Sequence, residues 1–461
     1  MVESIATVPY WEVEFDKDGA VVSDGGLVAG LAGSAVRDVF FFSHGWNNSF
    51  TGARNLYRAM FTMIAGMLTP EQLQATGFVG VLWPALLFPD DGPPDAGRPS
   101  ATGAAGSGVA GSGVAGTGLA ATRMAGAGPV DIGAAGVEPV VDPTVPPPPA
   151  TGADLAAALA HAFPGQEENL RVLGDLLDTQ PQDGAAVGEF YRRAAGLVTS
   201  PQTGGPEDNG ERFALEGDPH EIIDAMAGLP GSPGDAQGLD LFDKAWHGAR
   251  ELLRTLSYYE MKNRAGVVGE RGLGRLLGTL HGQNGQLRVH LLGHSFGARL
   301  AAFSLRGLPA PAAAGVSPVK SLLLIQAAFS HFAFSPAKPG ALAAFADRVD
   351  GPLVTTHSDH DRAVGTWYPA ASALAGQDAQ GVGNLPYRWG ALGFDGFQQD
   401  HVAAGPLQRQ GFPYQWTAGG FHRLDASAVI SKNLSGFSGA HCDIQHPEVT
   451  WAAVSAAGLG G

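Results

Sequence analysis

The sequence predicts an α/β protein with a mostly parallel central sheet and helices on both faces. Continuous apolar runs of strand length recur along the chain, as expected for strands that are buried on both faces. Segments with apolar residues at helical spacing separate most of these runs, and this alternation predicts parallel strands joined by crossover helices. The predicted core strands are 38–43, 78–83, 286–292, 321–325 and 351–356.

Further elements lie before, between and after these strands. Residues 8–23 predict a hairpin, because apolar and polar residues alternate from Trp11 to Phe15 and a turn sequence, DKDG, follows. A last strand is predicted at 421–430, and a final helix is predicted to begin near Pro447. The other predicted helices occupy 52–68, 153–200, 219–227 and 240–282.

Composition and charge limit the classes of function. The 461 residues are 44% hydrophobic and 16% charged, with a formal net charge of −16. Such an acidic chain disfavours nucleic acid as a partner and disfavours binding to anionic membranes through a basic patch. No apolar stretch is long enough to span a bilayer. The sequence does not indicate an oligomeric state.

Cysteine content and the first residues bear on location. The single cysteine, Cys442, cannot form an intrachain disulfide, which fits a reducing compartment. The first residues show no basic segment followed by an apolar run, so no ordinary secretory signal is visible. We expect a cytoplasmic location, with non-classical export as the alternative.

The chain divides into four predicted parts. Residues 1–88 and 241–461 carry the predicted strands and form the two parts of the core. Residues 89–152 are rich in Gly, Ala, Pro and Ser, bury little apolar surface per residue, and predict a flexible low-complexity linker. Residues 153–240 predict a helical insertion or cap.

The most informative motif is Gly293-His294-Ser295-Phe296-Gly297. It directly follows a predicted strand and precedes a helical run, ARLAAFSLRGL. A sharp strand-to-helix turn holds a serine hydroxyl out above the sheet edge, and small residues two before and two after it let strand and helix approach. This context predicts a nucleophile elbow with Ser295 as the nucleophile.

A serine nucleophile needs a histidine base and an acid that orients the histidine. Proteins with such an elbow supply these groups in the order serine, acid, histidine. The predicted acid is Asp361, just past the strand at 351–356, with Asp359 as the alternative. The predicted base is His441, with His446 as the alternative.

Acyl transfer also needs hydrogen-bond donors for the oxyanion. We expect one donor to be the backbone N–H of Phe296. The second is expected in the loop after the strand at 38–43, from the N–H of Trp46, with Asn47 as the fallback. In the same loop, His44 is expected to shape the backbone rather than to react.

Taken together, the segments FFSHGWNNS, FVGVLWP, VHLLGHSFGARL, HSDHDRAV and SGAHCDIQHPEV resemble the α/β-hydrolase superfamily, on its lipase and esterase side. The resemblance covers roughly residues 36–88 and 245–455. It implies the α/β-hydrolase fold and hydrolysis of a carboxylic ester or related acyl bond through an acyl-enzyme, without a cofactor. The implied substrate is a small-molecule or lipid-like acyl ester. The departure from the family is the insertion at 89–240, whose position is not the commonest one for a lid.

Alternatives remain open at this point. The fold could serve binding without catalysis, or the same machinery could cleave an amide or a thioester. Amphipathic runs at 155–163 and 170–177 predict a cap that supplies apolar walls to an acyl pocket. One further cluster consists of residue types that can bind a metal ion, namely His357, Asp359, His360 and Asp361. A loop that supplies the acid of the triad explains the same residues, so no metal is expected.

Overall fold

The structure, a computed structural model, describes residues 3–45, 50–85, 151–160, 162–208, 213–227, 241–310, 316–367, 390–434 and 439–460. Within these ranges the chain forms a 10-stranded sheet with the order β1-β2-β5-β4-β6-β7-β8-β10-β9, and β3 pairs with β2. The strands are β1 (Glu3–Ile5), β2 (Val8–Phe15), β3 (Val21–Ser23), β4 (Asp38–Ser43), β5 (Thr76–Leu82), β6 (Arg288–His294), β7 (Val319–Ile325), β8 (Leu353–His357), β9 (Val402–Pro406) and β10 (Phe421–Asp425).

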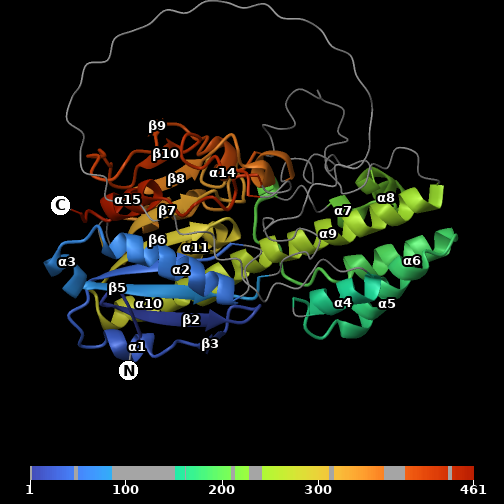
Figure 1. The fold of residues 1–461 in the computed structure, drawn as a ribbon, viewed down its shortest axis with the longest axis horizontal. Helices are drawn as coiled ribbons and strands as arrows, with labels where there is room; N and C mark the ends of the chain where they lie inside the picture. Colours follow the sequence, from blue (N-terminus) through green and yellow to red (C-terminus); the bar gives the residue numbers. More distant parts are fainter. Residues whose placement is uncertain are drawn as a thin grey trace, which may run out of the picture.

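The sheet is mostly parallel. Every pairing from β2 across the sheet to β9 is parallel, whereas β1 and β3 run antiparallel to β2. Figure 1 shows β2 and β3 towards the bottom of the view, β9 at the top, and helices beside the sheet. The prediction of an α/β fold with a mostly parallel sheet is confirmed.

Alternate residues of the central strands face opposite sides of the sheet. In β4, Phe40 and Phe42 belong to the apolar cluster of α2 and α15, whereas Val39 and Phe41 belong to that of α9, α10 and α11. All four side chains are buried, which explains why this strand is a continuous apolar run. The helices of the core are α1 (Leu27–Leu31), α2 (Phe50–Ala65), α3 (Pro70–Gln74), α9 (Leu241–Val267), α10 (Gly274–Gln283), α11 (Phe296–Gly307), α14 (Leu392–Asp395) and α15 (Pro447–Ala456).

The helical insertion packs beside the first part of α9. Its helices are α4 (Gly152–Ala160), α5 (Glu167–Thr179), α6 (Gly184–Ala195), α7 (Phe213–Glu216) and α8 (Pro219–Ala227). Figure 1 shows α9 extending from this bundle, at the right, to the sheet, where its second part reaches α11. The insertion and this face of the sheet share one apolar cluster, so α9 belongs to both.

Most predicted elements agree with the observed ones. The five predicted core strands match β4, β5, β6, β7 and β8 to within two residues at each end. The last strand was predicted too long, because β10 ends at Asp425 and the chain turns at 427–430. Sequence patterning missed β9, whose side chains are mostly exposed and whose position is the sheet edge. Most of the predicted linker at 89–152 lies outside the described residues.

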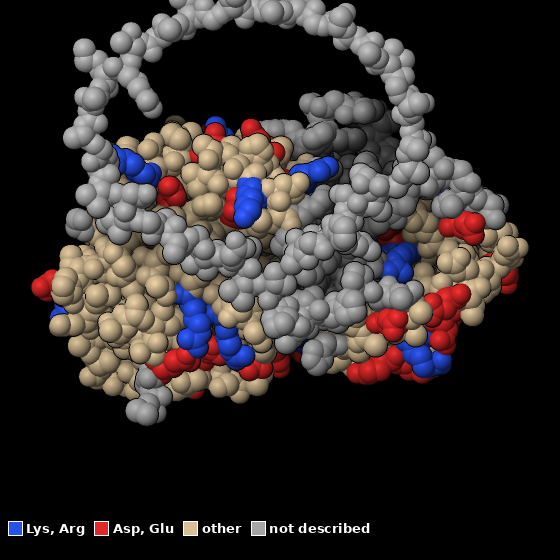
Figure 2. Space-filling view, viewed as in Figure 1, with Lys and Arg blue, Asp and Glu red and all other residues tan. Residues whose placement is uncertain are grey.

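Acidic side chains gather over the insertion. Figure 2 shows red surface concentrated there, at the lower right of the view, with a few blue side chains among it. On α5, Glu167, Glu168, Asp175 and Asp178 are all exposed, and such a surface repels anionic partners. In the part of the chain that the structure describes, no helix is both long and apolar enough for a transmembrane span.

Candidate active site

Ser295 occupies the turn between β6 and α11. Its φ of 57° and ψ of −124° lie outside the usual regions for a residue with a side chain, which costs about 1–3 kcal/mol. A Cβ at Gly293 would lie 2.3 Å from the carbonyl oxygen of Gly297, and a Cβ at Gly297 would lie 2.1 Å from that of Ser43. The glycine spacing of the motif therefore follows from the close approach of α11 to β6 and to the end of β4.

A hydrogen-bonded chain links three side chains that are far apart in sequence. Ser295 Oγ lies 2.8 Å from His441 Nε2, and His441 Nδ1 lies 2.7 Å from Asp361 Oδ2. All three residues are buried. The first choices for nucleophile, base and acid are thus brought together in the order that proton transfer from a serine requires.

The loop that carries His441 is held on the loop that carries Asp361. The N–H of Ala440 donates to the carbonyl of His360 at 3.0 Å, and Gly439 forms an isolated antiparallel bridge with Asp361. Gly439 has a φ of 60°, and a Cβ there would lie 2.5 Å from the carbonyl oxygen of His360. Glycine at this position lets the two loops meet at the spacing that the His441 and Asp361 side chains need.

His294 adds a second attachment for the base. Its Nε2 donates to the carbonyl oxygen of His441 at 2.9 Å, from the end of β6. Burial, together with the nearby His441, lowers the pKa of His294 to about 3, so its ring is neutral at ordinary pH. The histidine of the elbow motif therefore holds the backbone of the loop that carries the proposed base.

The alternative acid and base lie away from Ser295. Asp359 is exposed, and its main-chain N–H donates to the hydroxyl of Ser427 at 3.2 Å. His446 is the residue before α15, and its Nε2 lies 2.9 Å from Asp443 Oδ1. The structure therefore joins Ser295 to the first-choice residues and not to these two.

The possible metal cluster around His357 is not assembled. Asp361 is engaged by His441, whereas Asp359 and His360 are exposed to solvent. Within the described ranges, no group of three or more His, Cys, Asp or Glu side chains is arranged to hold a metal ion.

Sequence reasoning missed Gln326, which follows β7 directly and is fully buried. Its Nε2 donates to Asp361 Oδ2 at 2.9 Å, the same oxygen that His441 contacts. No motif marks this glutamine. The only available signal was its place at the carboxyl end of β7, because β7 lies between the strand of the serine and the strand of the acid.

The loop after β4 approaches Ser295 across the centre of the sheet. A Cβ at Gly45 would lie 2.8 Å from the Cβ of Ser295. β4 and β6 are neighbours in the sheet, but the chain continues from β4 to β5 on one side of this pair and from β6 to β7 on the other. The loops that follow β4 and β6 therefore lie beside each other where the two connections lead in opposite directions. Ligands in open α/β sheets bind in the crevice at such a point. Trp46, the expected second oxyanion donor, and Asn47, its fallback, lie outside the described residues.

His44 has the structural surroundings that the sequence predicted. Its ring stacks on Trp83 with 5.6 Å between centroids, and its main-chain N–H donates to the hydroxyl of Tyr57 at 3.0 Å. Its Nδ1 lies 2.9 Å from the carbonyl oxygen of Gly45. Burial lowers the pKa of His44 to about 4. These contacts fix the backbone just before the proposed oxyanion loop.

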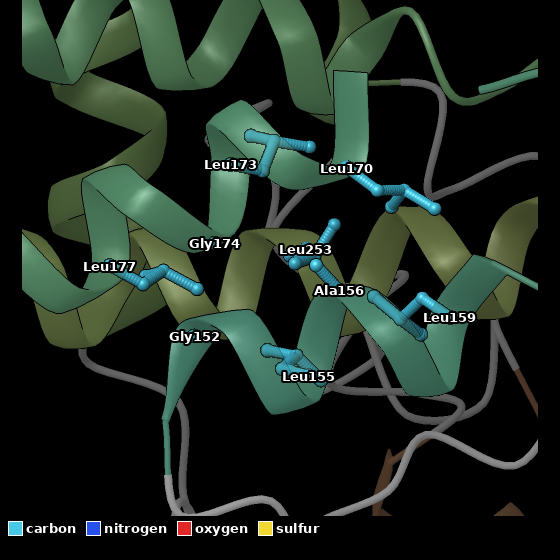
Figure 3. Close-up of a pocket in the computed structure, with 9 residues that line it drawn as sticks. All are labelled: Gly152, Leu155, Ala156, Leu159, Leu170, Leu173, Gly174, Leu177 and Leu253. Carbon is cyan, nitrogen blue, oxygen red and sulfur yellow. The ribbon is translucent and has the colours of Figure 1, made fainter. Parts of the chain in front are cut away.

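The leucines of the insertion do not have the role expected for them. Leu155, Leu170, Leu173 and Leu177 point toward one another and toward Leu253 of α9, around a small apolar hollow inside the bundle (Figure 3). The expectation that these runs wall an acyl pocket is therefore wrong, since their side chains form the insertion's own interior.

Buried charges fasten the insertion to the core. Asp208, near the end of the segment after α6, pairs with Arg299 of α11 and with Lys262 of α9, and its Oδ1 accepts the N–H of Ser330 at 3.0 Å. Glu260 of α9 accepts two main-chain N–H groups of the same segment, at 2.9 and 2.8 Å. Breaking a buried pair costs about 3–5 kcal/mol, so this attachment opposes a swinging motion of the segment.

Comparison with known proteins adds no assignment, since no protein-family model, curated protein or solved structure matches the chain.

Proposed function

We propose that this protein is a serine hydrolase of the α/β-hydrolase type that cleaves a carboxylic ester or related acyl bond through an acyl-enzyme. The observation that supports this most strongly is the chain from Ser295 through His441 to Asp361, with links of 2.8 and 2.7 Å. The strained turn at Ser295, at the carboxyl end of the parallel strands, is the second support. The proposed substrate is a small-molecule or lipid-like acyl ester.

In the proposed reaction, His441 removes the proton of Ser295 as the serine oxygen attacks the acyl carbon. The Nδ1–H of His441 stays bonded to Asp361, whose negative charge stabilises the imidazolium. The proton on Nε2 then passes to the oxygen of the departing alcohol, and the acyl group remains on Ser295. Water, deprotonated by His441 in turn, cleaves this ester and restores the serine hydroxyl.

The tetrahedral intermediate carries a negative oxygen that needs donors. The N–H of Phe296 is the proposed first donor, since Phe296 begins α11 and the positive end of the helix dipole lies there. Trp46 is the proposed second donor. Gly45, the residue before Trp46, supports this proposal, because its close approach to Ser295 brings the start of the loop beside the nucleophile.

A fluorophosphonate probe tests the nucleophile. The native protein is expected to take one covalent label, and Ser295→Ala is expected to take none. Ser321→Ala is the matched control, because Ser321 Oγ also lies 2.9 Å from a buried histidine nitrogen, that of His290. Folded protein that takes no label, or a label that survives in Ser295→Ala, would contradict the proposal.

A panel of p-nitrophenyl esters of graded acyl length tests turnover. Asp361→Asn is expected to lower kcat by about 10⁴-fold, because the histidine loses the acceptor that sets its tautomer. Asp359→Asn, on the same loop but exposed, is the control and should keep the native kcat. Absence of turnover across the panel would favour a binding role instead.

A further inference from the structure

We infer that Gln326 is a positioning residue for the acid of the proposed hydrolase, holding the Asp361 carboxylate in place for His441 through its side-chain amide. The inference rests on the proposed function. The amide lies between two strand ends, with Asp361 after β8 on one side and the β6 turn of Ser295 on the other. Gln326 Nε2 lies 2.9 Å from Asp361 Oδ2, so this oxygen has two donors, the amide and the imidazole.

The orientation of the amide is determined by its other partners. Thr356 Oγ1 accepts the main-chain N–H of Gln326 at 3.2 Å, so its own hydrogen is available to donate to Gln326 Oε1 at 3.0 Å. The Nε2 group faces two acceptors, Asp361 Oδ2 and, at 3.1 Å, the carbonyl oxygen of Gly393. A flipped amide would place its oxygen against both acceptors, so only one orientation satisfies all of these groups.

The backbone at Gln326 supports a role that constrains its geometry. Gln326 has a φ of 45°, in the left-handed region that disfavours residues with a side chain. The residue is fully buried, so leaving its amide hydrogens unsatisfied would carry a desolvation cost. A strained backbone and a fully bonded amide together aim one N–H at Asp361, whose Oδ1 is held separately by the N–H of Val364 at 3.2 Å. Both carboxylate oxygens are thereby fixed.

Two substitutions separate positioning from simple packing. Gln326→Met keeps the length of the side chain and removes the donor, so kcat for ester hydrolysis should fall about 10- to 100-fold, the usual effect of losing a hydrogen bond to a charged group. KM should stay the same, because Gln326 is fully buried and presents no surface to a substrate. Gln398→Met is the control, since Gln398 is a partly buried amide that, like Gln326, donates to a main-chain carbonyl, here two of them at 2.7 and 3.4 Å.

Gln326→Glu provides a pH signature that packing alone would not produce. At low pH the new carboxyl group keeps its proton and donates to Asp361 as the amide does. As the pH rises this proton is lost, two adjacent carboxylates repel each other, and the rate should fall. The variant should therefore gain a descending alkaline limb. The titratable groups on the elements around this position are Asp361, His357, His441, Cys442, Asp395 with its partner His331, and the neutral His294.

The measurement is kcat against pH for the native protein and the variants, with melting temperatures to check folding. A fall in kcat for Gln326→Met and a new alkaline limb for Gln326→Glu support the inference. Native kcat and an unchanged pH profile in both variants overturn it and leave Gln326 as a structural cross-link. If Gln326→Met does not fold, the limb in Gln326→Glu decides. If neither folds, Thr356→Val decides, since freeing the amide should lower kcat. An inactive native protein would instead refute the proposed function.

Discussion

Burial of neutral histidines beside the proposed nucleophile makes the stability of this protein depend on pH in a way that can be calculated. Burial lowers the pKa of His294 from 6.5 to about 3, and that of His44 from 6.5 to about 4. The unfolded chain therefore binds protons that the folded chain does not, and stability falls as the pH falls. For His294 the loss begins near pH 6.5 and continues to about pH 3.

The size of the effect follows from the shift. Each pH unit inside this window costs about 1.4 kcal/mol for one fully buried histidine, so between pH 8 and pH 5 His294 alone should lower the free energy of unfolding by about 2 kcal/mol. His44 should contribute a similar amount over the same interval, because its pKa also lies below 5. Together these losses are a large fraction of the 5–15 kcal/mol typical of a folded domain.

The substitution His294→Gln tests the contribution of His294 to this pH-dependent loss of stability. A glutamine Nε2 can still donate to the carbonyl of His441 but does not titrate. The variant should therefore lose about 2 kcal/mol less than the native protein between pH 8 and pH 5 in urea denaturation. Thr355→Val is the control, because it removes a buried hydrogen bond of 3.1 Å to the carbonyl of Leu324 without removing a titratable group. If the native and His294→Gln stabilities change in parallel with pH, the neutral buried state of His294 is wrong.

Two further substitutions test the turn and the attachment of the insertion. Gly297→Ala places a Cβ 2.1 Å from the carbonyl oxygen of Ser43, the last residue of β4. It should lower the free energy of unfolding by about 3 kcal/mol, and a native melting temperature would contradict the close approach. Asp208→Asn leaves Arg299 and Lys262 without their shared carboxylate and should cost about 3–5 kcal/mol in urea denaturation. Asp224→Asn is the control, because it breaks only the exposed pair with Lys244 and should cost less than about 1 kcal/mol. Equal losses of stability in Asp208→Asn and Asp224→Asn would contradict a buried cluster at Asp208.

The parts of the site with local sequence features were predictable. The serine was identifiable because a continuous apolar run, two glycines and a helical run follow one another within a few residues of Ser295. The choice between Asp361 and Asp359 was a weaker inference, because both follow β8 closely. In the structure the choice depends on the bridge to Gly439, a contact across nearly 80 residues that no local pattern reports.

Other features depend on which strands are neighbours. Gln326 meets Asp361 only because β7 lies beside β8, and a glutamine after an apolar run has no distinctive pattern. A second serine–histidine–aspartate set shows the reverse problem. His290 lies 2.9 Å from both Ser321 and Asp38, but the set is buried at the starts of β4, β6 and β7. Residue types alone would not distinguish this set from the proposed site. The two sets differ in lying at opposite ends of the strands, and only Ser295 occupies a sharp strand-to-helix turn.

The 27-residue helix α9 has a consequence for how the molecule is held together as a unit. Its early turns complete the interior of the insertion, and its later turns, with Lys262 among them, lie against the core helix that starts beside Ser295. Without α9, neither the insertion nor the core has a complete hydrophobic interior. The insertion is thus not an independent folding unit, because its unfolding would also expose the face of the core that packs on α9. The insertion and the core should therefore unfold in one cooperative step.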